Sequence, residues 1–128
     1  MIQFDIDKLN HSLDEVRALL DPQCRLHLGE ESKKRIAKCR NYLDERMKNQ
    51  KAPIYGVTTG FGSLCNVSVD KDQLSQLQKN LVMSHSCGVG EEVRPEIVRL
   101  MIALKVKSLS YGYSGVRVET VERLVDFF

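Results

Sequence analysis

Residues 55–62, Tyr-Gly-Val-Thr-Thr-Gly-Phe-Gly, form the most informative segment of the chain. Three of these eight residues are glycine, which adopts positive φ at little cost, so the backbone can turn tightly and approach a ligand closely. Successive N–H groups in such a loop can form a concavity that binds an anion. Tyr55 could then be held as a phenolate and act as a base. The alternative is an ordinary glycine-rich turn after a short strand, with Tyr55 half-buried.

Other short motifs follow this loop in a fixed order. They are Leu77-Gln78-Lys79-Asn80-Leu81, Ser84-His85, Gly88-Val89-Gly90, Val98-Arg99 and Ser114-Gly115-Val116-Arg117-Val118-Glu119. Each motif is weak alone, but their joint occurrence in this order is specific. Over residues 50–128 the order and spacing resemble the histidine ammonia-lyases, members of the aromatic amino acid ammonia-lyase family. The resemblance implies that residues 1–128 are a single N-terminal domain or fragment of a mostly helical fold, whose central helical part begins near residue 95.

The resemblance also implies roles for individual residues. Tyr55 matches the catalytic tyrosine, which removes a weakly acidic β-proton when ammonia is eliminated from an α-amino acid. An ordinary tyrosine has a pKa near ~10, so its phenolate needs stabilisation to act at neutral pH. Backbone donors from residues 60–62, or a cation from elsewhere in the assembly, could supply it. The loop residues that would support the site are Gly56, Thr58, Thr59, Gly60, Phe61 and Gly62.

Ser84 and His85 carry the choice of substrate. In isolation, His85 is interpreted as a histidine at a helix end, satisfied by a backbone carbonyl. By resemblance, the pair lies where these lyases contact the substrate side chain, and Ser-His is similar to the histidine-specific members. Two imidazoles can exchange a hydrogen bond, which a phenyl ring cannot. We therefore expect L-histidine as substrate and urocanate as product, with a tyrosine or phenylalanine ammonia-lyase or an aminomutase as alternatives.

The electrophile of the family is a methylidene-imidazolone formed from an internal Ala-Ser-Gly tripeptide, without a metal. This tripeptide does not occur in the 128 residues. Tyr113-Ser114-Gly115 comes nearest, and we interpret its serine as a helix N-cap. The chain also ends on Phe127-Phe128, within an apolar stripe. We therefore expect a piece of a longer protein that is inactive alone and, by resemblance, forms a homotetramer when full length.

Composition is typical of a soluble globular protein, with 42% apolar residues, 28% charged residues and a net charge of +2. The basic cluster Lys33-Lys34-Arg35 lies beside Glu30-Glu31, which favours a solvated helix face over a nucleic-acid site. No apolar run approaches the ~20 residues of a membrane span, and the first residues lack the basic start and apolar core that a signal peptide would have. The cysteines and histidines lack the spacing of a metal site. We expect a cytoplasmic protein with reduced thiols, and no membrane, nucleic-acid or metal partner.

Hydrophobic periodicity predicts a mainly α fold with one or two short strands. Helices are expected over residues 5–20 and 31–50, over 95–111 and from 116 onward. A further helix is expected to begin after the N-cap Asp70, with the stripe Leu74, Leu77, Leu81 and His85, and to end just before Cys87-Gly88. Pro95 marks the start of the helix over 95–111, which is apolar on nearly every side and so is expected to be buried. Short strands are expected over 24–28 and 54–57. A rival to the enzyme is a non-catalytic interaction domain that binds a partner through the helix 95–111 and the open face of 116–128.

Overall fold

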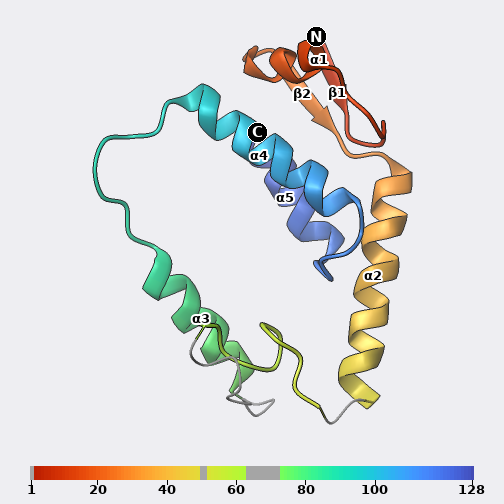
Figure 1. Cartoon of the computed structure of the whole chain (residues 1–128), viewed down its shortest axis with the longest axis vertical. Coiled ribbons are helices and arrows are strands. Elements are labelled where there is room, and N and C mark those ends of the chain that lie inside the picture. Colours follow the sequence, from red (N-terminus) through yellow and green to blue (C-terminus); the bar gives the residue numbers. More distant parts are fainter. Residues whose placement is uncertain (1, 50–51, 63–72) are drawn as a thin grey trace. The chain divides into compact units, whose positions relative to one another are not determined.

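The computed structural model describes residues 2–49, 52–62 and 73–128 (Figure 1). The described part is mainly helical, with two short strands, as predicted. It forms two compact units, one of Met1–Arg46 with Glu92–Phe128 and the other of Met47–Glu91. The elements are β1 (Ile2–Asp5), α1 (Leu13–Arg17), the 3₁₀ helix η1 (Ala18–Leu20), β2 (Cys24–His27), α2 (Glu30–Asn49), α3 (Leu74–His85), α4 (Pro95–Ser110) and α5 (Val118–Phe127).

The first unit opens with a pair of parallel strands rather than a long helix. β1 pairs with β2 in the register Ile2↔Cys24 to Asp5↔His27, and α1 and η1 form the crossover. The predicted strand at 24–28 is confirmed, but the predicted helix over 5–20 is wrong. Ser12 and Glu15 form a capping box that starts α1 at Leu13, so only the end of that range is helical.

The core of the first unit joins the strands to three helices. Alternate residues of β1 and its extension, Phe4 and Ile6, point inward and are buried. They meet apolar side chains from η1, β2, α2, α4 and α5. The buried apolar residues are Phe4, Ile6, Leu19, Cys24, Leu26, Leu28, Ile36, Ala103, Val106, Leu109 and Val121.

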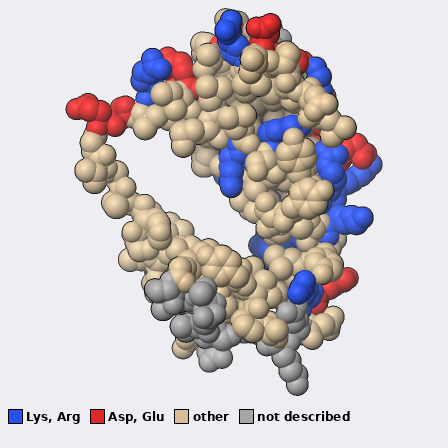
Figure 2. Space-filling model, viewed as in Figure 1, with Lys and Arg blue, Asp and Glu red and all other residues tan. Residues whose placement is uncertain are grey.

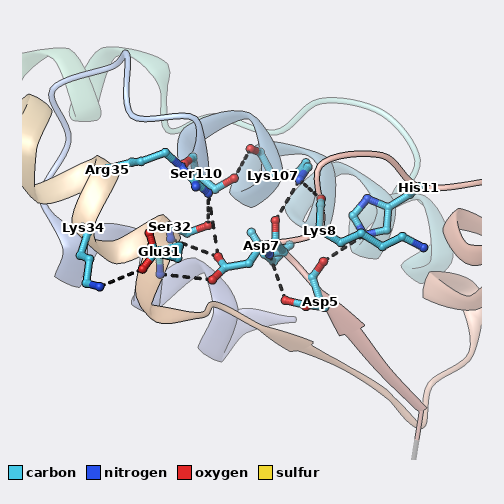
Figure 3. A network of polar contacts seen from close by, with 11 residues as sticks. Asp5, Asp7, Lys8, His11, Glu31, Ser32, Lys34, Arg35, Lys107 and Ser110 are labelled. Carbon is cyan, nitrogen blue, oxygen red and sulfur yellow. Dashed lines mark hydrogen bonds and ion pairs between the residues drawn. The ribbon is translucent and has the colours of Figure 1, made fainter.

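A carboxylate from the loop after β1 caps α2. Asp7 accepts hydrogen bonds from the backbone N–H groups of Glu31 and Ser32, at 3.2 and 3.1 Å, in the first turn of the helix (Figure 3). The free N–H groups of a helix N-terminus need acceptors, and a negative charge there is favourable. Gly29 makes room for this contact, because a Cβ on it would lie 2.2 Å from a carboxylate oxygen of Asp7.

Lys107 ties the same loop to α4. Its ammonium donates to the carbonyl oxygens of Ile6 and Lys8, at 2.8 and 2.5 Å, as Figure 3 shows. Burial, and then the charge of Arg35, lower the pKa of Lys107. The N-terminal segment is therefore fastened to α2 by Asp7 and to α4 by Lys107.

Helix α4 is buried on only one face within the described residues. Pro95 occupies its first turn and Gly112, with φ of 75°, follows its end, both as predicted. One face packs in the core, but Ile97, Val98, Met101 and Leu104 are 39–62% exposed. The prediction that this helix is buried on every side is therefore wrong for the described residues, because α5 and the N-terminal elements cover only one face.

The connection from α4 to α5 is a turn held by α2. Arg117 is the N-cap of α5, so the predicted N-cap at Ser114 is wrong. Gly115 has φ of 66°, and its carbonyl accepts a hydrogen bond from Arg40 at 3.2 Å. This close approach of α2 requires a residue without a Cβ, because a Cβ on Gly115 would lie 2.6 Å from the Leu43 side chain.

The basic cluster at the start of α2 is paired with acidic side chains. Lys33 lies 3.0 Å from Glu122 and 3.6 Å from Glu30, and Lys34 lies 2.8 Å from Glu31. In Figure 2, blue and red side chains are mixed over this unit rather than gathered into one field. The arrangement is that of a solvated face, as the sequence pattern predicts.

The second unit carries α3 and the glycine loop. Leu74, Leu77 and Leu81 form a half-buried stripe on α3, while His85, the next position on this face, is exposed. The helix begins after Gln73, and the predicted cap Asp70 lies outside the described residues. The predicted strand at 54–57 is wrong, because Thr58 closes a turn by donating its backbone N–H to the Ile54 carbonyl at 2.9 Å.

Candidate functional site

The glycine loop is held by its two threonines. The hydroxyl of Thr58 accepts from the backbone N–H of Ile54 at 2.8 Å, and that of Thr59 accepts from Gly56 at 3.2 Å. The Thr59 hydroxyl in turn donates to the Gly60 carbonyl at 3.0 Å and is buried. Threonine hydroxyls commonly form such local hydrogen bonds in turns. Here they give residues 54–60 a set of internal hydrogen bonds.

Gly56 allows the loop to pack against its own aromatic residue. It has φ of 68°, and a Cβ on it would lie 3.0 Å from the Phe61 ring. Phe61 meets the Tyr55 ring edge-on, with centroids 5.8 Å apart and an interplanar angle of 71°. Such an edge-to-face pair is a favoured aromatic geometry. The Phe61 ring therefore limits the positions that the Tyr55 ring can take.

Tyr55 presents its phenol to solvent and is 63% exposed. The alternative expectation, an ordinary turn with Tyr55 half-buried, is therefore wrong about the burial of this side chain. Among the described residues no donor reaches the Tyr55 hydroxyl, and the N–H groups of residues 54 and 56–58 all donate inside the loop. The expected phenolate contact from the backbone of residues 60–62 is absent within residues 52–62.

Ser84 and His85 are brought together at the end of α3. The Leu81 carbonyl, one turn earlier, lies 2.9 Å from Nδ1 of His85 and accepts from the Ser84 hydroxyl at 2.9 Å. The Ser84 oxygen and His85 Nδ1 are 3.0 Å apart. A backbone carbonyl satisfying a helix-end histidine agrees with the simpler interpretation of His85, and the imidazole remains exposed.

The candidate residues lie in one unit but form two separate groups. Tyr55 and its loop belong to Met47–Glu91, as do Ser84 and His85. Within the described part of the chain, no hydrogen bond or ring contact joins the loop to the end of α3. Sequence reasoning did not identify Leu81 as the residue whose carbonyl contacts His85. Its position four residues before His85 on a helix could have indicated this contact.

Arg99, from the Val98-Arg99 motif, has a structural position in the other unit. Its guanidinium donates to the carbonyl oxygens of Leu19, Asp21 and Cys24 at 3.1–3.3 Å. It also donates to the Phe128 carbonyl and stacks on the Phe128 ring, 3.8 Å from the centroid. Arg99 therefore joins α4 to η1, β2 and the end of α5.

The described ranges offer no other obvious centre of chemistry. In residues 2–49, 52–62 and 73–128, no three His, Cys, Asp or Glu side chains gather where they could hold a metal ion. None of the helices described is long and apolar enough to cross a membrane.

Comparison with known proteins places these features in one family. The model of the aromatic amino acid lyase family matches residues 11–128. The chain belongs to this family. A histidine ammonia-lyase 2 of Fusobacterium nucleatum is 42% identical over 122 residues, which are 95% of this chain and 24% of the relative. The chain thus spans about a quarter of that relative's length.

Solved structures of lyase-like enzymes share the fold. The tyrosine aminomutase of Streptomyces globisporus superposes with a TM-score of 0.87 at 32% identity, covering 98% of this chain and 24% of that one. The histidine ammonia-lyase of Trypanosoma cruzi superposes with a TM-score of 0.80 at 33% identity, covering 97% of this chain and 23% of that one. The expected N-terminal portion of the aromatic amino acid lyase fold is therefore confirmed.

Proposed function

We propose that this chain is the N-terminal part of a histidine ammonia-lyase, with Tyr55 as the base and His85 and Ser84 at the substrate side chain. The observation that carries the proposal is the position of Tyr55. It stands exposed at the head of a loop locked by Thr58 and Thr59, in a chain that belongs to the aromatic amino acid lyase family. A rigid loop with a free phenol is suited to proton transfer from a small substrate.

In the proposed reaction, the Tyr55 phenolate takes the β-proton of L-histidine. The electron pair of the broken C–H bond forms the double bond between Cα and Cβ. The Cα–N bond breaks and its own electron pair leaves with the nitrogen, so the products are urocanate and ammonia. Because no donor in the described chain reaches the Tyr55 hydroxyl, a cation or donor from the rest of the assembly stabilises the phenolate.

The electrophile of the family cannot form from these residues. No Ala-Ser-Gly occurs in the sequence, and the nearest segment, Tyr113-Ser114-Gly115, leads into the turn that Arg40 holds through the Gly115 carbonyl. We therefore assign this chain only proton transfer and recognition of the substrate side chain. The tetrameric assembly and cytoplasmic location implied by the family resemblance belong to the same proposal.

The choice of histidine rests on Ser84 and His85, supported by relatives that are histidine ammonia-lyases. The structural likeness to a tyrosine aminomutase favours a second candidate, an aminomutase acting on an aromatic amino acid. The two differ in their products, because a mutase returns the amine to the β-carbon, whereas a lyase releases it.

The test compares this chain with the complete protein, each expressed in a host without an ammonia-lyase of its own. We expect the complete protein to form urocanate and ammonia from L-histidine, and residues 1–128 to form neither. A β-amino acid product would favour the aminomutase. Ammonia release by residues 1–128 alone, or no reaction of the complete protein with histidine, would refute the proposal.

A further inference from the structure

The two oxygens around His85 determine which ring nitrogen carries the proton. Nδ1 lies 2.9 Å from the Leu81 carbonyl oxygen, and a carbonyl oxygen only accepts. A proton on Nδ1 satisfies this contact, whereas a lone pair there would face another lone pair. The Ser84 hydroxyl donates to the same carbonyl at 2.9 Å, which leaves its own lone pairs free to face Nδ1 at 3.0 Å. All these contacts are satisfied together only when Nδ1 is protonated.

Nε2 then carries the lone pair of the neutral ring. Within the described residues it has no hydrogen-bond partner, and the His85 side chain is exposed at the end of α3. Free histidine favours the opposite tautomer, with the proton on Nε2. The end of α3 therefore selects the tautomer in which the outward nitrogen accepts a hydrogen bond.

We propose that Ser84 is a positioning residue that, with the Leu81 carbonyl, holds His85 with Nε2 as a hydrogen-bond acceptor for an N–H donor on the substrate ring. This inference rests on the proposed function, because it places the substrate imidazole at His85. It adds the direction of the hydrogen bond, because the substrate ring must be the donor and His85 the acceptor. A phenyl ring carries no such donor, so phenylalanine leaves Nε2 unpaired.

Ser86 provides a matched control for Ser84. Its hydroxyl makes the same kind of bond one turn back, to the Val82 carbonyl at 2.6 Å, and lies in the same exposed segment. Ser86→Ala therefore removes a serine-to-carbonyl bond without removing the oxygen beside Nδ1. Ser84→Thr keeps the hydroxyl at position 84 and is the conservative variant.

The first experiment records long-range ¹H–¹⁵N correlations of the histidine rings in the 128-residue chain, at a pH of about 8.5, where ordinary histidines are neutral. Loss of signals in His85→Gln assigns that ring among the three histidines. We expect His85 to be protonated mainly on Nδ1 in the wild type, Ser84→Thr and Ser86→Ala. Ser84→Ala keeps the Leu81 carbonyl but removes the second acceptor beside Nδ1, so part of the population should move toward Nε2. A wild-type ring protonated on Nε2, or no change in Ser84→Ala, would overturn the inference.

The second experiment measures steady-state kinetics of the same variants in the complete protein. We expect Ser84→Ala to raise KM for histidine about three- to tenfold, the effect of weakening one hydrogen bond, with a smaller change in kcat. Ser86→Ala should match the wild type. An unchanged KM in Ser84→Ala overturns the positioning role. A complete protein that does not use histidine refutes the proposed function, while the tautomer measured in the first experiment still decides the local arrangement.

Discussion

The carboxylate of Asp7 lies 3.1 Å from the backbone nitrogen of Ser32, twenty-five residues later in the chain, and caps α2 from outside the helix. Replacing Asp7 by Ala removes the acceptor for two N–H groups at once. We expect a loss of about 1–2 kcal/mol in the free energy of unfolding, measured by urea denaturation. Glu45→Ala, an exposed acidic residue later on α2, is the control and should change stability little. An equal effect of both substitutions would contradict the capping role.

The same carboxylate makes stability depend on pH. Burial opposes the charge of Asp7, but hydrogen bonds from Ser32 and Glu31 and the nearby Arg35 outweigh it and lower the pKa of Asp7. A carboxyl whose folded pKa is lowered stabilises the fold above its unfolded value of ~3.9 and loses this contribution as pH falls through the folded pKa. We expect the stability gap between wild type and Asp7→Ala to be full at pH 6 and to narrow as the pH falls below the ordinary carboxyl pKa. A stability difference between the two proteins that does not change with pH would contradict a role for the negative charge of Asp7.

Substituting Gly112 and Gly90 distinguishes the cost of backbone strain from the cost of a packing clash. Both have positive φ, 75° and 92°, but only a Cβ on Gly112 would meet another atom, the Arg35 carbonyl oxygen at 2.6 Å. Gly112→Ala should therefore cost at least about 2 kcal/mol, from strain together with a backbone clash. Gly90→Ala should cost about 1 kcal/mol from strain alone. Thermal unfolding of both variants checks this, and equal costs would mean that the α2–α4 contact adjusts freely.

The exposed apolar side chains of this chain predict self-association. Residues 97, 98, 101 and 104 on α4 and Phe127 on α5 are exposed, and uncovered apolar surface drives association at roughly 25 cal/mol per Å². We expect light scattering to show dimers or larger species at micromolar concentration. Phe127→Ser should shift the equilibrium toward monomer, whereas Phe128→Ser should also destabilise the fold because Phe128 stacks on Arg99. A wild-type chain that stays monomeric would contradict this account.

Substrate preference in the complete protein tests Ser84 and His85. Ser84→His with His85→Leu reproduces the His-Leu pair that, by resemblance, marks the tyrosine-specific lyases. The double variant should lose preference for histidine and gain relative activity on tyrosine, because the acceptor for the substrate imidazole is removed. The ratio of kcat/KM for the two amino acids is the measurement. A ratio equal to that of the wild type would remove the basis for choosing histidine.

Elements with strong local signals were predictable from the sequence. The long stripe of α2, Pro95 and Gly112 around α4, and the threonine contacts of the glycine loop all follow from local chemistry. The structure of the first twenty residues was not predictable in this way, because Ile6, Leu9 and Leu13 fit a helical stripe. In the structure, however, Leu9 and Leu13 are 69% and 87% exposed. There the parallel pairing of β1 with β2, a long-range contact, overrides a helical periodicity.

The candidate site was predictable in its residues more than in its contacts. The motifs indicated Tyr55, Ser84 and His85, but not that the N–H groups of residues 54 and 56–58 all donate inside the loop rather than to the Tyr55 hydroxyl. Nor could residue types reveal that the Leu81 carbonyl and the Ser84 hydroxyl both lie beside Nδ1 of His85. Such contacts depend on where backbone groups lie, which residue identity alone does not determine.

The central claim is that Tyr55 is the base, and the direct measurement is kcat of Tyr55→Phe in the complete protein. This change removes only the ionisable oxygen and keeps the ring that packs edge-on against Phe61. Tyr113→Phe is the control, because Tyr113 is 90% exposed and has no assigned role. We predict that Tyr55→Phe lowers kcat about 10²–10⁴-fold with little change in substrate binding, while Tyr113→Phe matches the wild type. A Tyr55→Phe enzyme within a few-fold of wild-type kcat would contradict the account.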